Sequence, residues 1–119
     1  MSGITVDIES GKPVLDRSVW DQFVVKVPAG ETVVIDSLPL SDFDSLSYEV
    51  SIFGPSQNNV KTLSLKILQF NGGLTEQVFS KIGSVGVLLH TGINEANFEL
   101  IAENTEAFNV GVCLTVLTA

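Results

Sequence analysis

The chain has 119 residues, a length that fits one domain. It is 45% hydrophobic and 17% charged, against a typical charged fraction of about 25%. We expect part of this apolar surface to lie outside the core and to mark contacts with other proteins. The net charge is −8 and no two of the 6 Lys and Arg residues are adjacent. The chain therefore lacks the cationic cluster that nucleic acid or an anionic membrane surface would require.

A single cysteine, Cys113, excludes an intramolecular disulfide and a multi-thiolate metal site within one chain. The first residues, "MSGITVDIESGKP", lack the basic and apolar regions of a signal peptide. No apolar run reaches the about 18 residues of a spanning helix. We therefore expect a protein that is made in a cytoplasm and does not enter a membrane.

The chain begins with a strand pattern in which Ile4, Val6 and Ile8 alternate with polar residues, followed by "SGKP" and a charged link. Because a lone strand cannot satisfy its own backbone, this one must pair with the domain's own sheet or, as an exchanged arm, with a neighbour's. Both possibilities stay open. We divide the chain into an N-terminal strand or arm, residues 1–17, and a β-sandwich domain, residues 18–119. Ile4, Val6 and Ile8 are candidate interface residues.

Alternation of apolar and polar residues dominates the remainder of the chain and predicts strands with one buried face. The clearest runs are 20–27, 31–37, 46–53, 61–67, 84–90, 96–103 and 108–118. Turn sequences separate them at 27–31, 53–59, 71–72, 90–97 and 102–108. A single helical turn is expected within 38–45. The fold class is therefore all-β: an antiparallel β-sandwich, jelly-roll-like, with about eight short strands and at most one helical turn.

The side chains that could carry chemistry are few and scattered. His90 is the only histidine, at an expected strand end without a local partner, and we expect it to face solvent or a turn. Cys113 lies in the middle of a strand, where a small packed residue is expected. Asp42 and Asp44 lack the further ligands of a calcium loop and are expected to serve turns and caps.

The two large amphipathic aromatic residues differ in their expected roles. Tyr48 falls on an inward face, whereas Trp20 lies opposite the apolar face of its strand and is a fourth candidate interface residue. Both could stack on a sugar ring, as in carbohydrate-binding sandwiches. A pair of carboxylates across a cleft could hydrolyse a glycoside, but the sequence nominates none of the 14 acids.

The stretch "VVIDSLPLSDFDSLSYEVSI" resembles a module in virion structural proteins of tailed bacteriophages. In that module a strand ends in Asp-Ser, a Pro-containing link follows, and a strand with Tyr returns. The matching residues are Asp36, Ser37, Pro39, Phe43, Ser45 and Tyr48. The similarity extends over residues 18–118 through "KTLSLKILQF", an Asn-Gly turn, "LTEQVFSKIG" and a closing hairpin. Where the pattern often has Arg and Lys before the Tyr, this chain has Asp44 and Ser47.

The resemblance implies a non-enzymatic bacteriophage virion protein, and we predict a capsid decoration (cement) protein that acts through many weak protein contacts. The alternatives are a neck, tail or fibre subunit, or a carbohydrate-binding domain for host attachment. The expected partners are copies of the chain, as a homo-oligomer with a trimer as the predicted form, and major capsid or other virion proteins. No cofactor, metal, nucleic acid or membrane partner is expected.

Overall fold

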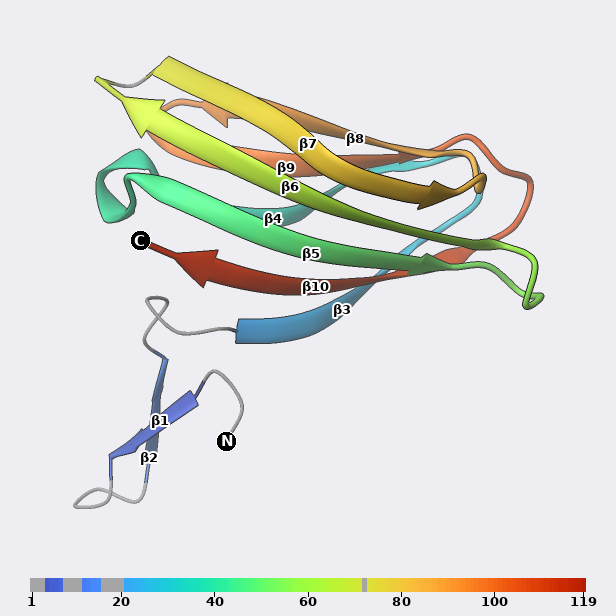
Figure 1. Cartoon of the computed structure of the whole chain (residues 1–119), viewed down its shortest axis with the longest axis horizontal. Helices are drawn as coiled ribbons and strands as arrows, with labels where there is room; N and C mark the ends of the chain where they lie inside the picture. The colour runs from blue at the N-terminus through green and yellow to red at the C-terminus, as the bar shows by residue number, and fades with distance from the viewer. Residues whose placement is uncertain (1–3, 8–11, 16–20, 72) are drawn as a thin grey trace.

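A computed structural model describes residues 4–7, 12–15, 21–71 and 73–119 of the chain. Within these residues it has ten strands and one short 3-10 turn (Figure 1). The elements are β1 (Ile4–Asp7), β2 (Lys12–Leu15), β3 (Asp21–Val27), β4 (Thr32–Pro39), η1 (Leu40–Asp42), β5 (Ser45–Phe53), β6 (Val60–Phe70), β7 (Gly73–Gly83), β8 (Val87–Asn94), β9 (Asn97–Asn104) and β10 (Val110–Thr118).

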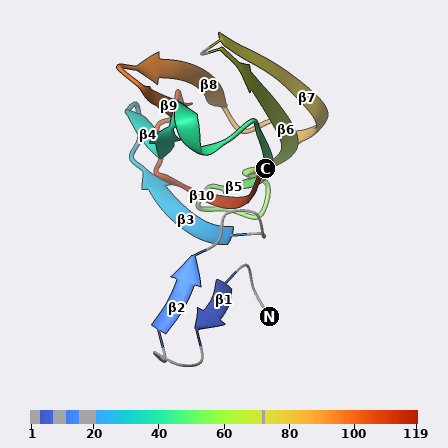
Figure 2. The same ribbon diagram turned by 90° about the vertical axis from the view of Figure 1, so that its left-hand side faces the viewer.

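Eight of these strands form two antiparallel sheets that pack face to face (Figure 2). The five-stranded sheet has the order β3-β10-β5-β6-β7, and the three-stranded sheet has the order β4-β9-β8. The outer pairs β3·β10 and β4·β9 are nested along the chain, as in a jelly roll, whereas β5, β6 and β7 follow one another as a simple meander. The predicted fold class, an antiparallel sandwich with about eight strands and at most one helical turn, is confirmed.

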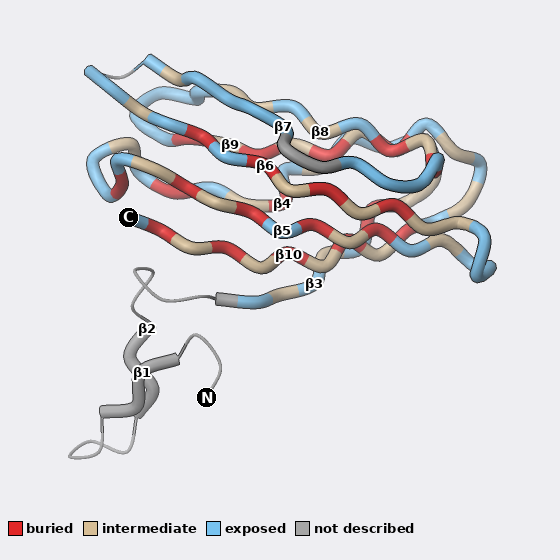
Figure 3. Tube along the Cα trace, viewed as in Figure 1, coloured by how far each residue is buried: buried red, intermediate tan, exposed pale blue. Residues whose placement is uncertain are grey.

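The core lies between the sheets, and the alternation of the sequence identifies it correctly (Figure 3). In β10 every second residue is buried from end to end, and β5 and β6 bury their alternate residues in the same way. The predicted inward residues that are buried are Leu46, Tyr48, Val50, Ile52, Leu63, Leu65, Ile67, Phe98, Leu100, Ala102, Val110, Val112, Leu114 and Val116. Ala96, the first apolar residue of the expected strand 96–103, is exposed because it lies in the β8–β9 turn.

Three of the predicted connections are confirmed. Gly30 ends the β3–β4 turn with φ 71°, and the Glu31 amide donates to the Pro28 carbonyl at 3.1 Å. Residues 54–59 connect β5 to β6. Phe70 pairs with Gly73, so that two residues close the long β6–β7 hairpin, and Asn71 has the positive φ, 52°, that this turn favours.

The predicted connection at residues 90–97 is wrong in its length. Strand β8 continues to Asn94, which pairs directly with Asn97, and Glu95 takes φ 58° in a two-residue turn. The turn-like composition "HTGINEAN" is overridden because β9 offers β8 a complete antiparallel partner. His90 therefore lies within a strand and not at its end.

The N-terminal strand pairs with a strand that the sequence pattern did not predict. β1 and β2 form an antiparallel two-stranded sheet, from Ile4 opposite Leu15 to Asp7 opposite Lys12. β2 contains Pro13, which an edge strand accommodates. The expectation of an isolated strand is thus corrected. The division of the chain near residue 17 stays a prediction, because residues 16–20 lie outside the described part.

Asn104, at the end of β9, holds one end of the sandwich together from within. Its side chain is 1% exposed, and its Nδ2 donates to the carbonyls of Val27 (3.1 Å), Pro28 (3.2 Å) and Phe108 (2.8 Å). Its Oδ1 accepts the Glu106 amide at 2.9 Å. One buried amide thereby satisfies the β3–β4 turn and the β9–β10 connection together.

Replacing Asn104 by Ala should lower the free energy of unfolding by about 3 kcal/mol, because buried backbone groups at both connections lose their partner. Urea denaturation measures the change. Asn109 offers a matched control: it is exposed and accepts a single bond from the Ala29 amide at 2.9 Å. Asn109→Ala should cost less than about 1 kcal/mol. Equal losses in the two variants would show that Asn104 has no special role.

Strands β4 and β5 are joined by a hydrogen bond between side chains of the two sheets. The Tyr48 hydroxyl, on β5, donates to Asp36 Oδ2, on β4, at 2.6 Å. Tyr48 is 1% exposed, as its predicted inward face requires, so its ring is not available for stacking on a sugar. Phe43, in the link between the two strands, packs edge-on against Phe98 with ring centroids 5.6 Å apart. Asp36, Phe43 and Tyr48 thus position the crossing of the chain from one sheet to the other.

Tyr48→Phe keeps the ring and removes the bond to a carboxylate, so it should lower the free energy of unfolding by about 1.5–3 kcal/mol. Tyr48→Leu also removes part of the buried ring and should cost more, because packing is lost in addition. Thermal and urea denaturation of both variants separate the two contributions. A Tyr48→Phe variant as stable as the wild type would contradict the role of this bond.

Candidate functional site: a groove at the open edge of the sandwich

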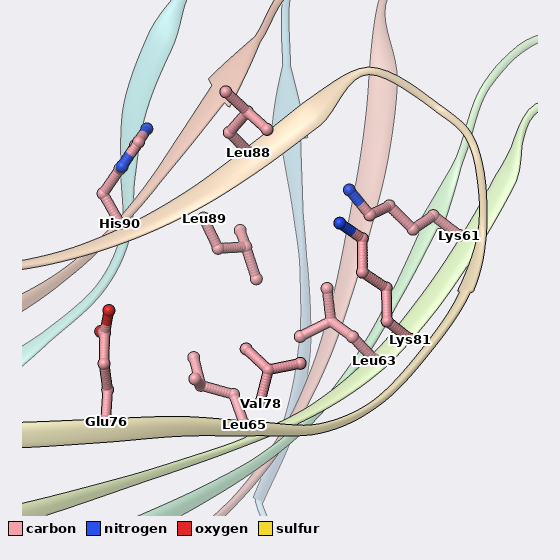
Figure 4. Close-up of a pocket in the computed structure, with 9 residues that line it drawn as sticks. All are labelled: Lys61, Leu63, Leu65, Glu76, Val78, Lys81, Leu88, Leu89 and His90. Carbon is pink, nitrogen blue, oxygen red and sulfur yellow. The ribbon is translucent and has the colours of Figure 1, made fainter.

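A groove of about 210 Å³ lies where edge strand β7 of one sheet faces edge strand β8 of the other. In the described chain β7 pairs only with β6, and β8 pairs only with β9, so no backbone ladder closes this edge. Figure 4 shows the residues that line the groove: Lys61, Leu63, Leu65, Glu76, Val78, Lys81, Leu88, Leu89 and His90.

The middle of the groove is apolar because the inner faces of three strands meet there. Leu63 and Leu65 come from the buried face of β6, Val78 from β7 and Leu89 from β8. A bulge in β7 shifts its register relative to β6: Ser64 pairs with Ser80, whereas the next residue, Leu65, pairs with Val78. This shift lets both Val78 and Lys81 lie opposite inward residues of β6 and face the groove.

Polar contacts connect the sheets at both ends of this apolar floor. Lys61 Nζ donates to the Val87 carbonyl at 2.9 Å, which ties β6 to the start of β8. The Thr91 hydroxyl donates to Glu76 Oε2 at 2.5 Å, which ties β8 to β7. These side chains take the place of the missing backbone pairing at the open edge.

Lys61 occupies a position at which the alternation of β6 would place an apolar residue. It is 5% exposed. Burial, together with the neighbouring charge of Lys81, lowers the pKa of Lys61 from the ordinary lysine value of 10.5. Sequence reasoning missed this residue, although its position two residues before Leu63 on an inward face was a sign that could have identified it.

His90 lies at the mouth of the groove and is half exposed, as predicted. Its Nε2 is 3.0 Å from Glu103 Oε1. The sequence around His90 suggested no carboxylate, because Glu103 comes from the neighbouring strand β9 and only the pairing of β8 with β9 brings the two together. The contact lies at the surface.

The other sequence-predicted residues lie away from the groove. Cys113 is half-buried on β10, and Gln22 Nε2 lies 3.7 Å from its sulfur. The turn predicted around Asp42 is confirmed as η1, whose N-cap is Pro39 without a side-chain cap, so the expected capping by Asp42 and Asp44 is not observed. Among the described residues no cluster of three or more His, Cys, Asp or Glu is arranged to hold a metal ion. Ile8 and Trp20 lie outside the described residues.

Exposed apolar side chains gather around the same edge. Six of the nine large hydrophobic residues that are exposed in the described chain belong to β6, β7 and β8. These six, which we call the edge patch, are Leu68, Phe70, Val78, Ile82, Leu88 and Ile93. Phe70 is the most exposed of them, at 80%. The expectation that apolar residues lie on the exterior is therefore confirmed, and they concentrate on the two strands of the open edge and on β6, the neighbour of β7.

Comparison with known proteins found a similar fold but no matching sequence family. No protein-family model matches the chain, and no curated protein sequence matches it. The fold resembles part of a tailspike protein, gp49 from Acinetobacter baumannii bacteriophage Fri1, with a TM-score of 0.51 and 12% identity over 87% of this chain and 18% of that chain. The tailspikes of A. baumannii phage AM24 (TM-score 0.47, 6% identity, 87% and 26% covered) and Acinetobacter phage vB_ApiP_P1 (TM-score 0.47, 13% identity, 84% and 22% covered) are further solved structures of this kind.

One prediction is corrected by this comparison. The chain was predicted not to be an enzyme, but the Fri1 tailspike that shares its fold is described as a capsular polysaccharide depolymerase. The fold therefore occurs within an enzyme. The lack of catalytic sequence motifs in the present chain is no ground for excluding activity. The chain spans about a fifth of the length of that tailspike. In the described residues no helix is long and apolar enough to cross a bilayer.

The lowered pKa of Lys61 has a measurable consequence for stability. Between that lowered pKa and 10.5 the unfolded chain binds more protons than the folded chain, so the penalty of the buried charge is relieved as pH rises through this window. Lys61→Met should therefore flatten the rise in the free energy of unfolding that the wild type shows as the pH increases from the lowered pKa of Lys61 toward 10.5.

Urea denaturation at several pH values measures this slope. Lys66→Met is the matched control, since Lys66 is exposed on the other face of the same strand. An Lys61→Met variant with the slope of the wild type would show that the Lys61 ammonium is not penalised by its surroundings.

Proposed function

We propose that the chain is a β-sandwich module of a bacteriophage tail or tail fibre, located in the virion, that contacts neighbouring proteins through its open edge. The observation that carries the proposal is the edge patch on β6, β7 and β8, beside an edge strand of 11 residues with one unpaired side. The likeness to the Fri1 tailspike supports the phage context, because 87% of this chain corresponds to a fraction of that longer protein.

The physical reason is the cost of leaving such an edge in water. A long edge strand presents unpaired backbone groups to another strand, and exposed apolar side chains beside it favour the same contact. Ile82 on β7 and Leu88 on β8 have 69% and 44% of their surface exposed. Covering them with a neighbouring protein, including another copy of the chain, would bury this surface. Self-association as a homo-oligomer is part of the proposal.

The tail or fibre position takes precedence over capsid decoration, which was the first prediction from the sequence. The structural neighbours are tailspikes, and no observation on the described residues favours a place on the capsid. Binding of a host glycan has weaker support, because Tyr48 is buried and Trp20 lies outside the described residues. Glycan binding is therefore an outcome of the test and not a second proposal.

The test removes apolar surface from one edge of the sandwich at a time. Ile82→Ser on β7 should weaken incorporation into particles, or self-association measured by light scattering, by about tenfold or more, because one buried side chain of this size contributes about 1.5–3 kcal/mol. Val24→Ser is a matched control. Val24 is 68% exposed on β3, at the opposite edge of the same sheet, and its substitution should change incorporation less than about twofold.

Gold-labelled antibody on intact phage particles locates the protein independently, and label on the tail is the expected result. Label confined to the capsid would contradict the tail position. Equal incorporation of the Ile82→Ser and Val24→Ser proteins would contradict the role of the edge patch. Glycan binding lost on Trp20→Ala, with no effect of Ile82→Ser on assembly, would replace the proposal by host attachment.

A further inference from the structure

Two lysines of an otherwise acidic chain point into the same groove. Lys61 lies on β6 and Lys81 on β7, and Figure 4 shows their ammonium groups side by side at one end. The chain has 6 Lys and Arg residues against 14 Asp and Glu. A third of its cations therefore line one groove, where they repel each other.

Neither lysine is neutralised by a carboxylate in the described part of the chain. The recorded partner of Lys61 Nζ is the neutral carbonyl of Val87, which leaves two of the three donors of the ammonium group for other partners. Glu76 lines the same groove, but it lies at the opposite end and accepts the Thr91 hydroxyl. Lys61 is 5% exposed, whereas Lys81 is exposed at the groove. Because a buried charge is normally paired, the Lys61 ammonium, which lies beside a second cation, gives the groove a local preference for an anion.

The remainder of the groove determines what kind of anion it accepts. Next to the ammonium groups lie Leu63, Leu65, Val78 and Leu89, which offer dispersion contacts and no hydrogen bonds. The volume of about 210 Å³ is below the about 300–1,000 Å³ of sites for drug-sized ligands. The groove thus suits a small ligand with a charged end and a short hydrocarbon body.

We propose that the groove between β7 and β8 binds small apolar monocarboxylates, with the carboxylate between Lys61 and Lys81 and the hydrocarbon body along Leu63, Leu65 and Leu89. The mutual repulsion of the two ammonium groups, which contributes to the lowered pKa of Lys61, is relieved when the carboxylate is bound. A protein with a net charge of −8 repels anions in general. Binding at this point therefore depends on the local pair of lysines.

Hexanoate is the probe, and calorimetry together with methyl NMR of the full chain provides the measurement. Binding should shift the methyl signals of Leu63, Leu65, Val78 and Leu89. Affinity should rise about fourfold for each methylene added from butyrate to hexanoate, because each buried methylene contributes about 0.8 kcal/mol. Hexanol and hexylammonium, which lack the carboxylate, should bind at least about tenfold more weakly than hexanoate.

Two lysine variants separate the groove from the general charge of the protein. Lys81→Gln should weaken hexanoate binding about tenfold, through the loss of one charge-assisted contact. Lys66→Gln removes the same charge from an exposed site on the other face of β6 and should change binding less than about twofold. Circular dichroism and thermal denaturation of the two variants confirm that both remain folded.

Three outcomes would overturn the proposal. Acetate binding as tightly as hexanoate would show that the lysines act as a general anion site without an apolar partner. Hexanol binding as tightly as hexanoate would remove the role of the charge. Equal binding by the Lys81→Gln and Lys66→Gln proteins would place the ligand elsewhere. None of these results bears on the assembly role of the edge patch, which is tested through Ile82.

Discussion

The two sheets of this sandwich are held together by side chains, because each backbone ladder in the described residues stays within a single sheet. The interior contributes the apolar part of this contact, through alternate residues of β5, β6, β9 and β10. Polar side chains add fixed points where the chain crosses between sheets: Asn104 at the β3–β4 end, and Tyr48 with Asp36 at the β4–β5 crossing. The Tyr48–Asp36 bond joins β5 of one sheet to β4 of the other, and Asn104 on β9 reaches Val27 at the end of β3, so both contacts fix the relative placement of the sheets.

Because the backbone ladders stay within each sheet, the groove and much of the edge patch lie at β7 and β8. These two strands follow each other in the chain but belong to different sheets, so the connection between them leaves an edge that no ladder closes. Lys61 and Glu76 bridge this edge with one side chain each, and the space between the bridges becomes the groove. This edge is bridged by a few polar side chains and is otherwise lined by apolar residues. Such an edge is suited to contact with other molecules.

Local alternation was sufficient to predict the strands that have one buried face, and β5 and β10 show this most clearly. It could not predict that β8 continues to Asn94, because "HTGIN" has the composition of a loop and becomes a strand only by pairing with β9. It also could not predict the groove. Lys61 and Lys81 are brought together by the register of β6 with β7, including its bulge, and Glu103 reaches His90 from the adjacent strand β9. Sequence periodicity predicts which face of a strand is buried, but it does not predict the order of the strands in the sheets.

The order of strands also implies a gradient of protection across the five-stranded sheet. β5 and β10 each have hydrogen-bonded neighbours on both sides and contribute most of their alternate residues to the core, whereas β7 has a neighbour on one side. We therefore expect local opening to begin at the edge strands β7 and β3 and to proceed inward, and amide protons near the centre to be released only when the whole domain unfolds. A molecule that lies along the outer strand would slow the first of these steps, so the part of the fold that is easiest to open is also the part that a partner would stabilise most.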